Sequence, residues 1–227
     1  MSSKRVCVLG AGIIGSSLAI GLARLGYEVL VVERTAPRPG PSSFGIDVRS
    51  IAITPASKGF LASLGLWNKT LAEPYRSMLI WEDQGVANLD FDSEEVGQTC
   101  LGWIVEAKKF QIDIWEKLNS EGVSKITDSP VALSMQEDSV ELSFNDKSLT
   151  FDFLVGADGG DSFVRSQLAT PVKKVSSNHF ALASIVKTNF EHDGLALQKF
   201  LDAGPIAALP STSARVRTII WLSLIHI

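Results

Sequence analysis

Three glycines near the N-terminus restrict the fold of this chain more than any other feature. They are spaced as G-x-G-x-x-G, at Gly10, Gly12 and Gly15. The apolar stretch Arg5–Leu9 comes directly before them and is typical of a fully buried strand. The segment 13–25 follows with apolar residues at helical spacing. The pattern therefore predicts a strand, a tight turn and a helix.

The predicted helix has an apolar stripe and a stop signal. The stripe consists of Ile14, Leu18, Leu22 and Leu25. Gly26 follows where a C-terminal cap belongs. The next apolar stretch, 28–32, is a second candidate for a buried strand. The start of the chain is therefore predicted to form a β-α-β unit.

This β-α-β unit carries the features of a dinucleotide site. In such a site Gly10 permits the tight turn, Gly12 lets a pyrophosphate approach the backbone and Gly15 lets the helix pack closely on the strand. Amides at the start of the helix would face the phosphates. Glu33, at the end of the second strand, would accept hydrogen bonds from ribose hydroxyls. We expect an adenine dinucleotide, although the motif does not separate FAD from NAD and a plain glycine-rich turn is the alternative.

The remaining sequence contains more strand patterns than helix patterns. We expect antiparallel strands within 78–105, a three-stranded meander within 131–155, and further strands over 180–221. Residues 35–43 hold three of the nine prolines and predict a loop. Helices are predicted from Thr54, over 108–121 and over 162–168. In the first of these helices the expected buried residues are Phe60, Leu61 and Leu64.

Two further segments are candidates for ligand contacts. Gly156–Gly160 follows an apolar strand, and its Asp158 could hold ribose or ribityl hydroxyls. The alternative is a tight turn in which this carboxylate accepts local amides. Arg49 lies in a stretch whose other residues are mostly apolar and expected to be buried. Its guanidinium could lie over a phosphate or a flavin edge. A solvated surface arginine is the alternative there.

Composition excludes several functional classes. The formal net charge is −4 and the basic residues form no long run, so we expect no nucleic-acid partner. The two cysteines and three histidines show no metal-ligand spacing, so no metal is expected, and two distant thiols favour a reducing, cytoplasmic compartment. We recognise no signal peptide, no membrane-spanning helix and no nucleophile–base arrangement.

Several motifs in a fixed order carry a family resemblance. Besides the glycine fingerprint they are Asp-Val-Arg-Ser-Ile-Ala-Ile at 47–53, Leu-Gly-Leu-Trp at 64–67, Leu-Gly-Trp-Ile-Val-Glu at 101–106, Gly-Ala-Asp-Gly at 156–159 and Gly-Pro-Ile-Ala-Ala-Leu-Pro at 204–210. With them the chain resembles the ubiquinone-biosynthesis FAD-dependent hydroxylases of the 2-polyprenylphenol hydroxylase type. These are flavin monooxygenases similar to para-hydroxybenzoate hydroxylase. The resemblance covers residues 6–221.

The resemblance implies an α/β fold. It implies a Rossmann-like FAD-binding domain of the para-hydroxybenzoate-hydroxylase kind, with an antiparallel β-meander and the start of a mixed-sheet substrate domain. The expected division is 1–175 for the FAD-binding domain, with 74–105 contributing strands toward the substrate side, and 176–221 for a truncated substrate domain. Residues 222–227 resemble one reading frame of a sequencing adapter, and we expect them to be a non-native tail on a truncated reading frame.

The resemblance also implies a set of cofactor-binding residues. FAD would be held by Gly10, Ala11, Gly12, Ile13, Gly15, Glu33, Arg34, Arg49, Asp158 and Gly159. Where the family often has Asn or Arg after the Val-Glu pair, this chain has Ala107, which departs from the pattern. No catalytic base is assigned.

The activity implied by the resemblance is that of an FAD-dependent monooxygenase. It would use NAD(P)H and O2 to hydroxylate the aromatic ring of a polyprenylated phenol. The implied partners are that substrate and other ubiquinone-biosynthesis proteins, with peripheral contact at the inner membrane. Two alternatives stay open: a related FAD monooxygenase acting on another aromatic or alkene substrate, and an inactive nucleotide-binding fragment.

Overall fold

The computed structural model describes residues 3–175 and 177–224, which fold into two compact units. The first unit consists of Met1–Arg38 and Gln111–Lys173, and the second of Pro39–Phe110 and Lys174–Ile227. Each unit is therefore assembled from two separate parts of the chain. The domain boundaries expected from the sequence follow a different division, and they stay a prediction.

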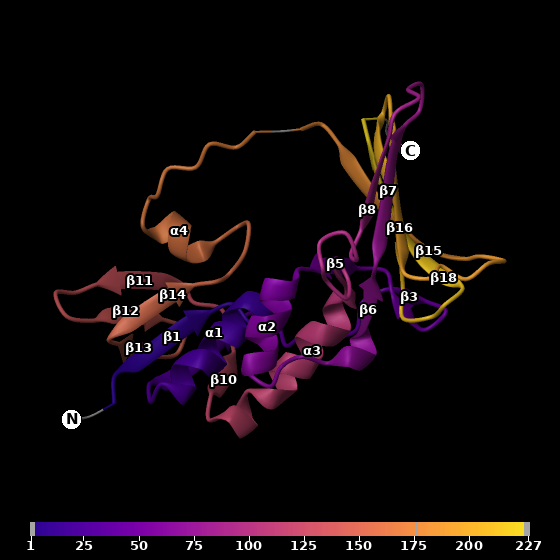
Figure 1. Cartoon of the computed structure of the whole chain (residues 1–227). Helices are drawn as coiled ribbons and strands as arrows, with labels where there is room; N and C mark the ends of the chain where they lie inside the picture. The colour runs from indigo at the N-terminus through magenta and orange to yellow at the C-terminus, as the bar shows by residue number, and fades with distance from the viewer. Residues whose placement is uncertain (1–2, 176, 225–227) are drawn as a thin grey trace. The chain divides into compact units, whose positions relative to one another are not determined.

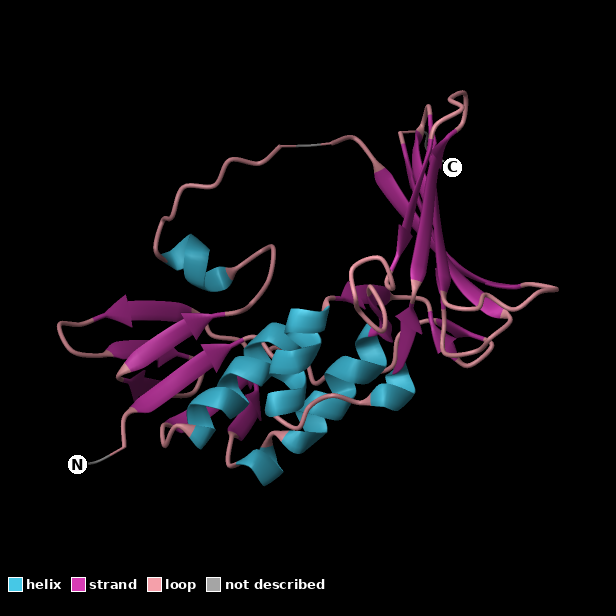
Figure 2. Cartoon of the chain, viewed as in Figure 1, coloured by secondary structure: helices cyan, strands magenta, loops and turns pink. Residues whose placement is uncertain are grey.

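A four-stranded parallel sheet forms the centre of the first unit (Figures 1 and 2). Its order is β10-β2-β1-β14. The strands are β1 (Arg5–Leu9), β2 (Glu28–Glu33), β10 (Ser124–Thr127) and β14 (Phe153–Gly156). The helical segments that the first unit contains or shares are α1 (Ile13–Arg24), α3 (Ala107–Lys117), the 3-10 turn η2 (Asn119–Glu121) and α4 (Phe163–Gln167). The β1-α1-β2 part confirms the predicted β-α-β unit.

The buried face of α1 differs from the expected apolar stripe. Ile14 and Leu25, which belong to that stripe, are 81% and 77% exposed. The buried residues of this helix are Gly15, Ser16, Ser17, Ala19 and Ile20. The helix is held so close to the β1 turn that small side chains form most of its contact face. The predicted end is correct, because Gly26 has a left-handed φ of 89°.

The predicted meander is present, but its third strand is shorter than expected. The antiparallel strands are β11 (Ala132–Met135), β12 (Val140–Ser143) and β13 (Ser148–Phe151). Asp152 ends the meander, since its side chain accepts the N–H of Arg5 at 2.6 Å and its own N–H donates to the Arg5 carbonyl at 2.9 Å. The chain then pairs with β1 as β14. One apolar stretch of sequence therefore supplies two different sheets.

The central strand β1 contains a fully buried thiol. Burial raises the pKa of Cys7 to about 12. Cys100, in the second unit, is also buried and free. We expect neither thiol to react with a thiol reagent at pH 8 until the protein unfolds. Above pH about 9 only the unfolded Cys7 ionises, so the free energy of unfolding should fall as the pH rises toward 12. Fast labelling of the native protein would contradict this.

The second unit contains a six-stranded mixed sheet, with order β15-β18-β17-β16-β7-β8. Its strands are β7 (Ser77–Glu82), β8 (Asn88–Asp92), β15 (Phe180–Lys187), β16 (Leu195–Leu201), β17 (Gly204–Pro210) and β18 (Val216–Ser223). The pair β16–β7 is parallel and the other pairs are antiparallel. This confirms the α/β fold class and the expected mixed sheet.

Two smaller sheets and one helix complete the second unit. These elements are β3 (Ser42–Ser43), β4 (Ile46–Asp47), β5 (Ser50–Ile53), α2 (Pro55–Ser63), the 3-10 turn η1 (Lys69–Leu71), β6 (Ala72–Tyr75) and β9 (Gly102–Glu106). The strand β9 pairs with β5 and β6 and not with β7 or β8. The strands expected within 78–105 are therefore divided between two sheets, with β7 and β8 in one and β9 in the other. In α2, Thr54 caps the helix as predicted, Leu61 and Leu64 are buried, and Phe60 is 55% exposed, contrary to expectation.

The strand β18 continues into the segment that we expected to be a non-native tail. Leu222 and Ser223 pair with Ala181 and Phe180 of β15. Residues 225–227 lie outside the described part of the chain, and the origin of this tail stays a prediction. Within residues 3–175 and 177–224, no helix is long and apolar enough to cross a membrane.

Candidate functional site

The first unit has a cavity at the carboxyl ends of its parallel strands. Its volume is about 690 Å³. Residues at or just beyond the end of each strand line it: Leu9, Gly10 and Gly12 at β1, Val32 to Arg34 at β2, Asp128 to Pro130 at β10, and Ala157 to Asp161 at β14. The carboxyl ends of parallel strands are where open α/β sheets bind ligands. The cavity is therefore the candidate site.

Main-chain hydrogen bonds join three of these strand ends. The N–H of Gly10 donates to the Val32 carbonyl at 2.8 Å, and the N–H of Ala157 donates to the Leu9 carbonyl at 2.7 Å. Gly10 has φ of 106°, and a Cβ there would lie 2.3 Å from the Ala157 oxygen. Both the turn conformation and this close approach exclude a larger residue.

The other two glycines of the fingerprint have different surroundings. A Cβ on Gly15 would lie 2.1 Å from the Gly10 carbonyl oxygen, so this position holds α1 against the turn. A Cβ on Gly12 would meet no heavy atom within 4 Å. Gly12 is also the N-cap residue of α1, and no side chain of the described residues caps this helix end. The start of α1 is thus open toward an anion.

Glu33 lies at the end of β2, as predicted, and binds the glycine-rich turn. Its Oε2 accepts the N–H of Ala11 at 2.6 Å. The carbonyl of Ala11 accepts a hydrogen bond from Gln111 Nε2 at 3.0 Å. The Ala11 peptide is therefore fixed on both sides. Gln111 was not predicted as a site residue, because the pattern of the helix expected over 108–121 does not indicate which side chain reaches the turn.

Asp158 is held by the start of α4. Its Oδ1 accepts the Ser162 hydroxyl at 2.7 Å and its Oδ2 accepts the Val164 N–H at 3.2 Å. Ser162 in turn accepts the N–H of Arg165, which confirms it as the helix cap. The carboxylate therefore does what the tight-turn alternative required, and it also lines the cavity.

The cavity collects most of the predicted cofactor-binding residues. Its lining includes Gly10, Gly12, Glu33, Arg34, Asp158 and Gly159. Ala11 contributes its peptide as described, while Ile13 and Gly15 belong to α1. Arg49 is part of the second unit, and its role toward a cofactor stays a prediction. Residues 128–130 were not predicted as site residues, because no strand was expected at β10.

A second cavity, of about 340 Å³, lies within the second unit. Its lining is mostly apolar and comes from seven strands of that unit. The polar side chains among the lining residues are Tyr75 and Gln198. Burial raises the pKa of the Tyr75 phenol, with a smaller contribution from Cys100, so this hydroxyl stays protonated at neutral pH. The cavity offers an apolar space with few hydrogen-bonding groups.

Tyr75 owes its position to the residue opposite it in the neighbouring strand. Tyr75 pairs with Gly102 of β9. A Cβ on Gly102 would lie 2.9 Å from the Tyr75 hydroxyl oxygen and 2.8 Å from the Ile53 carbonyl oxygen. The glycine therefore leaves the room that the ring occupies.

A carboxylate close to Tyr75 in the sequence should affect stability in a pH-dependent way. Burial raises the pKa of Glu73, while His192 and Arg76 act in the opposite direction. Ionisation of Glu73 therefore lowers the free energy of unfolding once the pH rises above about 4.5, the ordinary pKa of a glutamate. Below that pH this destabilisation is absent. Glu73→Gln should raise the free energy of unfolding at pH 7 by less than about 1 kcal/mol, since the group is half-exposed. Urea titrations at pH 7 and pH 4 test this, and an equal gain at both would contradict it.

The first cavity fits an adenine dinucleotide. The uncapped start of α1 and the open space beside Gly12 suit a pyrophosphate, and the Glu33 carboxylate suits ribose hydroxyls. A model of the FAD binding domain matches residues 3–221. The chain belongs to this FAD-binding domain family. FAD is the cofactor of the family.

The curated relatives of this FAD-binding domain include ubiquinone-biosynthesis enzymes. It is 30% identical over 211 residues to 3-demethoxyubiquinol 3-hydroxylase of Escherichia coli, covering 90% of the chain and 54% of the relative. It is 28% identical to the ubiquinone hydroxylase UbiL of Rhodospirillum rubrum, covering 95% and 51%. The predicted family resemblance is confirmed. The chain spans about half the length of these relatives.

Solved structures share the fold of this FAD-binding domain. A variant of HpxO from Klebsiella pneumoniae, in complex with FAD, superposes with a TM-score of 0.76 at 20% identity. The match covers 96% of the chain and 57% of that structure. At this level of identity the likeness concerns the fold.

Proposed function

We propose that the chain carries the FAD-binding part of a monooxygenase that hydroxylates the aromatic ring of a polyprenylated phenol in ubiquinone biosynthesis. The main support is the 30% identity to 3-demethoxyubiquinol 3-hydroxylase, together with a nucleotide cavity at the carboxyl ends of a parallel sheet. In this reaction one oxygen atom of O2 enters the ring and the other leaves as water, while NAD(P)H supplies two electrons. Bound FAD supplies the redox chemistry.

The residues of the first unit would bind and orient this cofactor. The start of α1 and the backbone at Gly12 would hold the pyrophosphate, and Glu33 would hold the adenosine ribose. Asp158 would accept hydroxyls of the ribityl chain or of a ribose. We assign no residue as a general base. In a flavin hydroxylase the cofactor supplies the chemistry, and the protein chiefly binds and orients the reactants and excludes water.

The cavity of the second unit would take the ring of the substrate. Its volume of about 340 Å³ is within the range of small-molecule pockets and its lining is mostly apolar. The protonated Tyr75 hydroxyl and the Gln198 amide would bind the phenolic oxygen. An isoprenoid tail on the substrate favours peripheral contact with the inner membrane and proximity to other ubiquinone-biosynthesis proteins.

FAD titration of a Glu33→Gln variant tests the cofactor assignment. Losing the charged acceptor should weaken FAD binding about ten- to hundredfold. Glu28→Gln is the matched control, because Glu28 lies at the other end of β2 in an exposed ion pair with Arg5. Equal FAD affinity of the two variants would overturn the role of Glu33, and a wild-type chain that binds no FAD would overturn the proposed function.

Product analysis separates the proposed substrate from its alternatives. The protein is supplied with FAD, NAD(P)H and either a prenylated phenol or a soluble phenol. Hydroxylation of the prenylated phenol at much higher efficiency supports the proposal. Equal turnover of the soluble phenol favours a related FAD monooxygenase, and flavin binding with no NAD(P)H oxidation favours a nucleotide-binding chain without activity.

A further inference from the structure

A buried histidine joins two segments that border the cavity of the second unit. His192 is 4% exposed and lies in the loop between β15 and β16. Its ring Nε2 is 2.9 Å from the Ser211 carbonyl oxygen, and its Nδ1 is 3.1 Å from the Gly194 nitrogen. Its own N–H donates to the Ala214 carbonyl at 2.9 Å, and its carbonyl accepts the N–H of Leu195 at 2.8 Å. Both ring nitrogens and both main-chain groups are therefore bonded.

The two ring contacts fix the protonation of the imidazole. A carbonyl oxygen only accepts, so Nε2 carries the hydrogen that bonds to Ser211. A main-chain N–H only donates, so Nδ1 carries no hydrogen and accepts from Gly194. Protonation of Nδ1 would place two N–H groups against each other. The arrangement therefore requires the neutral imidazole with its hydrogen on Nε2.

Gly194 connects this contact to the strands that line the cavity. Its carbonyl accepts the N–H of Arg76 at 2.8 Å, at the junction of β6 and β7. Tyr75, which lines the cavity, directly precedes Arg76. Ala196 follows two positions after Gly194 and pairs with Met78, and both of these residues line the cavity as well. The bond from Gly194 to the histidine ring therefore lies where two walls of the cavity begin.

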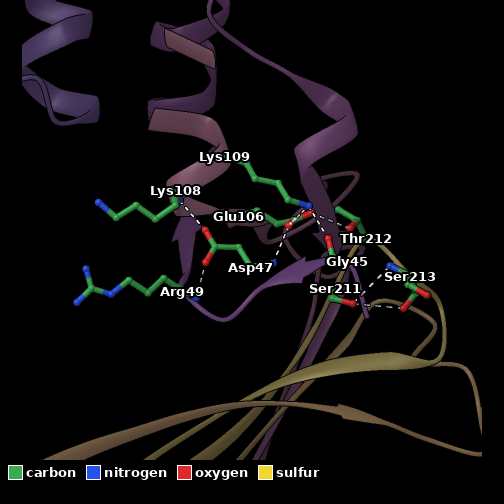
Figure 3. Close-up of polar contacts among 9 residues, drawn as sticks. All are labelled: Gly45, Asp47, Arg49, Glu106, Lys108, Lys109, Ser211, Thr212 and Ser213. Carbon is green, nitrogen blue, oxygen red and sulfur yellow. Dashed lines mark hydrogen bonds and ion pairs between the residues drawn. The ribbon is translucent and has the colours of Figure 1, made fainter. Parts of the chain in front are cut away.

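The other ring contact ends in a turn that is anchored by a buried polar cluster around Glu106. Next to Ser211, the Thr212 hydroxyl donates to Glu106 Oε1 at 3.1 Å (Figure 3). Glu106 is 5% exposed, and its Oε2 accepts the N–H of Asp47 at 2.8 Å. The same oxygen forms an ion pair with Lys109 at 2.7 Å. The histidine ring therefore bonds to a turn that β9 holds in place.

The charged side chains near His192 come from its own loop and from the segments on either side. They are Glu191 and Asp193 in the loop, Glu73 and Arg76 in the β6–β7 segment, and Arg215 and Arg217 at the start of β18. Glu191 and Arg215 form an ion pair at 3.6 Å. Burial raises the pKa of Glu73, and the charge of His192 acts in the opposite direction. Glu73 is therefore the neighbouring carboxylate whose own titration needs a control.

We propose that the neutral form of His192 is the positioning residue of the cavity that takes the substrate ring. By accepting the Gly194 N–H, it fixes the β6–β7 junction and the start of β16. These segments carry Tyr75 and Gln198, the side chains that would bind the phenolic oxygen. Protonation of the imidazole removes the contact, so phenol binding should weaken as the pH falls. The inference rests on the proposed function and adds to it a residue that acts on the phenol through its neighbours.

The pH dependence of phenol binding tests this role in the full chain with FAD in the buffer. Binding of 2-prenylphenol, a one-unit analogue of the proposed substrate, should weaken about tenfold between about pH 8 and pH 5, the range in which histidine ordinarily changes charge. Glu73→Gln should keep this dependence, and so should His179→Asn at an exposed histidine of the same unit. A flat profile of the wild type, or loss of the dependence in either control, would overturn the proposal.

Two substitutions at His192 separate its two ring contacts. Asparagine carries an acceptor near the place of Nδ1, glutamine carries an amide N–H near the place of Nε2, and neither amide titrates in this pH range. His192→Asn should bind 2-prenylphenol at pH 8 within about threefold of wild type and lose the pH dependence. His192→Gln should bind about tenfold more weakly at every pH. Equal binding by the two variants would show a structural role only and overturn the positioning role.

A measurement on the wild-type protein keeps the test valid if both variants unfold. Long-range nitrogen–proton NMR correlations of the histidine rings distinguish the Nε2–H tautomer from the Nδ1–H tautomer and from the imidazolium. We expect the Nε2–H tautomer of His192 at pH 8, and we expect its protonation to follow the loss of phenol affinity. An Nδ1–H tautomer, or an affinity that falls while His192 stays neutral, would overturn the proposal. A wild-type chain that binds no 2-prenylphenol at pH 8 would overturn the role of the cavity in the proposed function, and that of His192 with it, whatever the tautomer.

Discussion

Replacing Gly15 with alanine should destabilise the first unit by roughly 3 kcal/mol or more. The new Cβ would lie 2.1 Å from the Gly10 carbonyl oxygen and 3.0 Å from the Ala157 Cβ. The nearest atom belongs to the backbone and has no rotamer to change, so α1 must move away from the turn. Thermal or urea unfolding of the variant measures the loss.

Gly12→Ala is the matched control, because it makes the same change three positions earlier in the same motif. Its Cβ would meet no heavy atom within 4 Å, and its φ of −66° suits alanine. We expect the free energy of unfolding to change by less than about 0.5 kcal/mol, while FAD affinity falls because a methyl group enters the space proposed for the pyrophosphate. Equal stability of the two variants would contradict the close contact at Gly15.

Glu106→Ala should destabilise the second unit by about 3 kcal/mol. The substitution leaves the Asp47 N–H and the Thr212 hydroxyl without their acceptor, and it leaves Lys109 without its carboxylate. Buried donors without a partner cost about 1–3 kcal/mol each. Urea unfolding measures the effect.

Glu95→Ala is the control for Glu106→Ala. Glu95 is an exposed acidic residue of the same unit, so its loss should change stability by less than about 0.5 kcal/mol. If Glu106→Ala is as stable as this control, the buried cluster does not hold β4, α3 and the turn before β18 together.

Much of the first unit follows from local sequence rules. The strand β1, the glycine turn, the helix α1 and the strand β2 were predicted because each depends on neighbouring residues: an apolar run, the Gly10 turn and the Gly26 cap. The face that α1 buries was not predicted correctly. Apolar periodicity assumes that burial follows side-chain size, whereas here close backbone approach selects glycine, serine and alanine.

Pairing between distant segments accounts for the remaining errors. Nothing local marks Asp152 as the point where the chain leaves the meander, because its bonds are to Arg5. In the same way, the assignment of β9 to a separate sheet depends on β5 and β6. Within the candidate site, Gln111 acts through a carbonyl 100 positions earlier. Such contacts leave no periodic signal in the sequence.

The site glycines were easier to predict than the buried polar cluster. Gly10, Gly12 and Gly15 form a short motif with a known mechanical role, and the structure gives each one a separate physical reason. Asp47 and Glu106, in contrast, lie 59 positions apart and each looks like an ordinary acidic residue. Only the fold shows that they share one hydrogen bond and are both buried.

The pairing of β1 with β14 also sets the order of events during protein synthesis. Arg5 bonds to Asp152, which lies 147 positions later in the chain. At about 5–20 residues per second, the ribosome needs roughly 7 to 30 s to make that interval. During this time one edge of β1 has no partner, and the Ala157 wall of the nucleotide cavity does not exist. The nascent chain therefore carries an open strand edge until β14 is made, and we expect the cofactor to bind only after Ala157 has been translated.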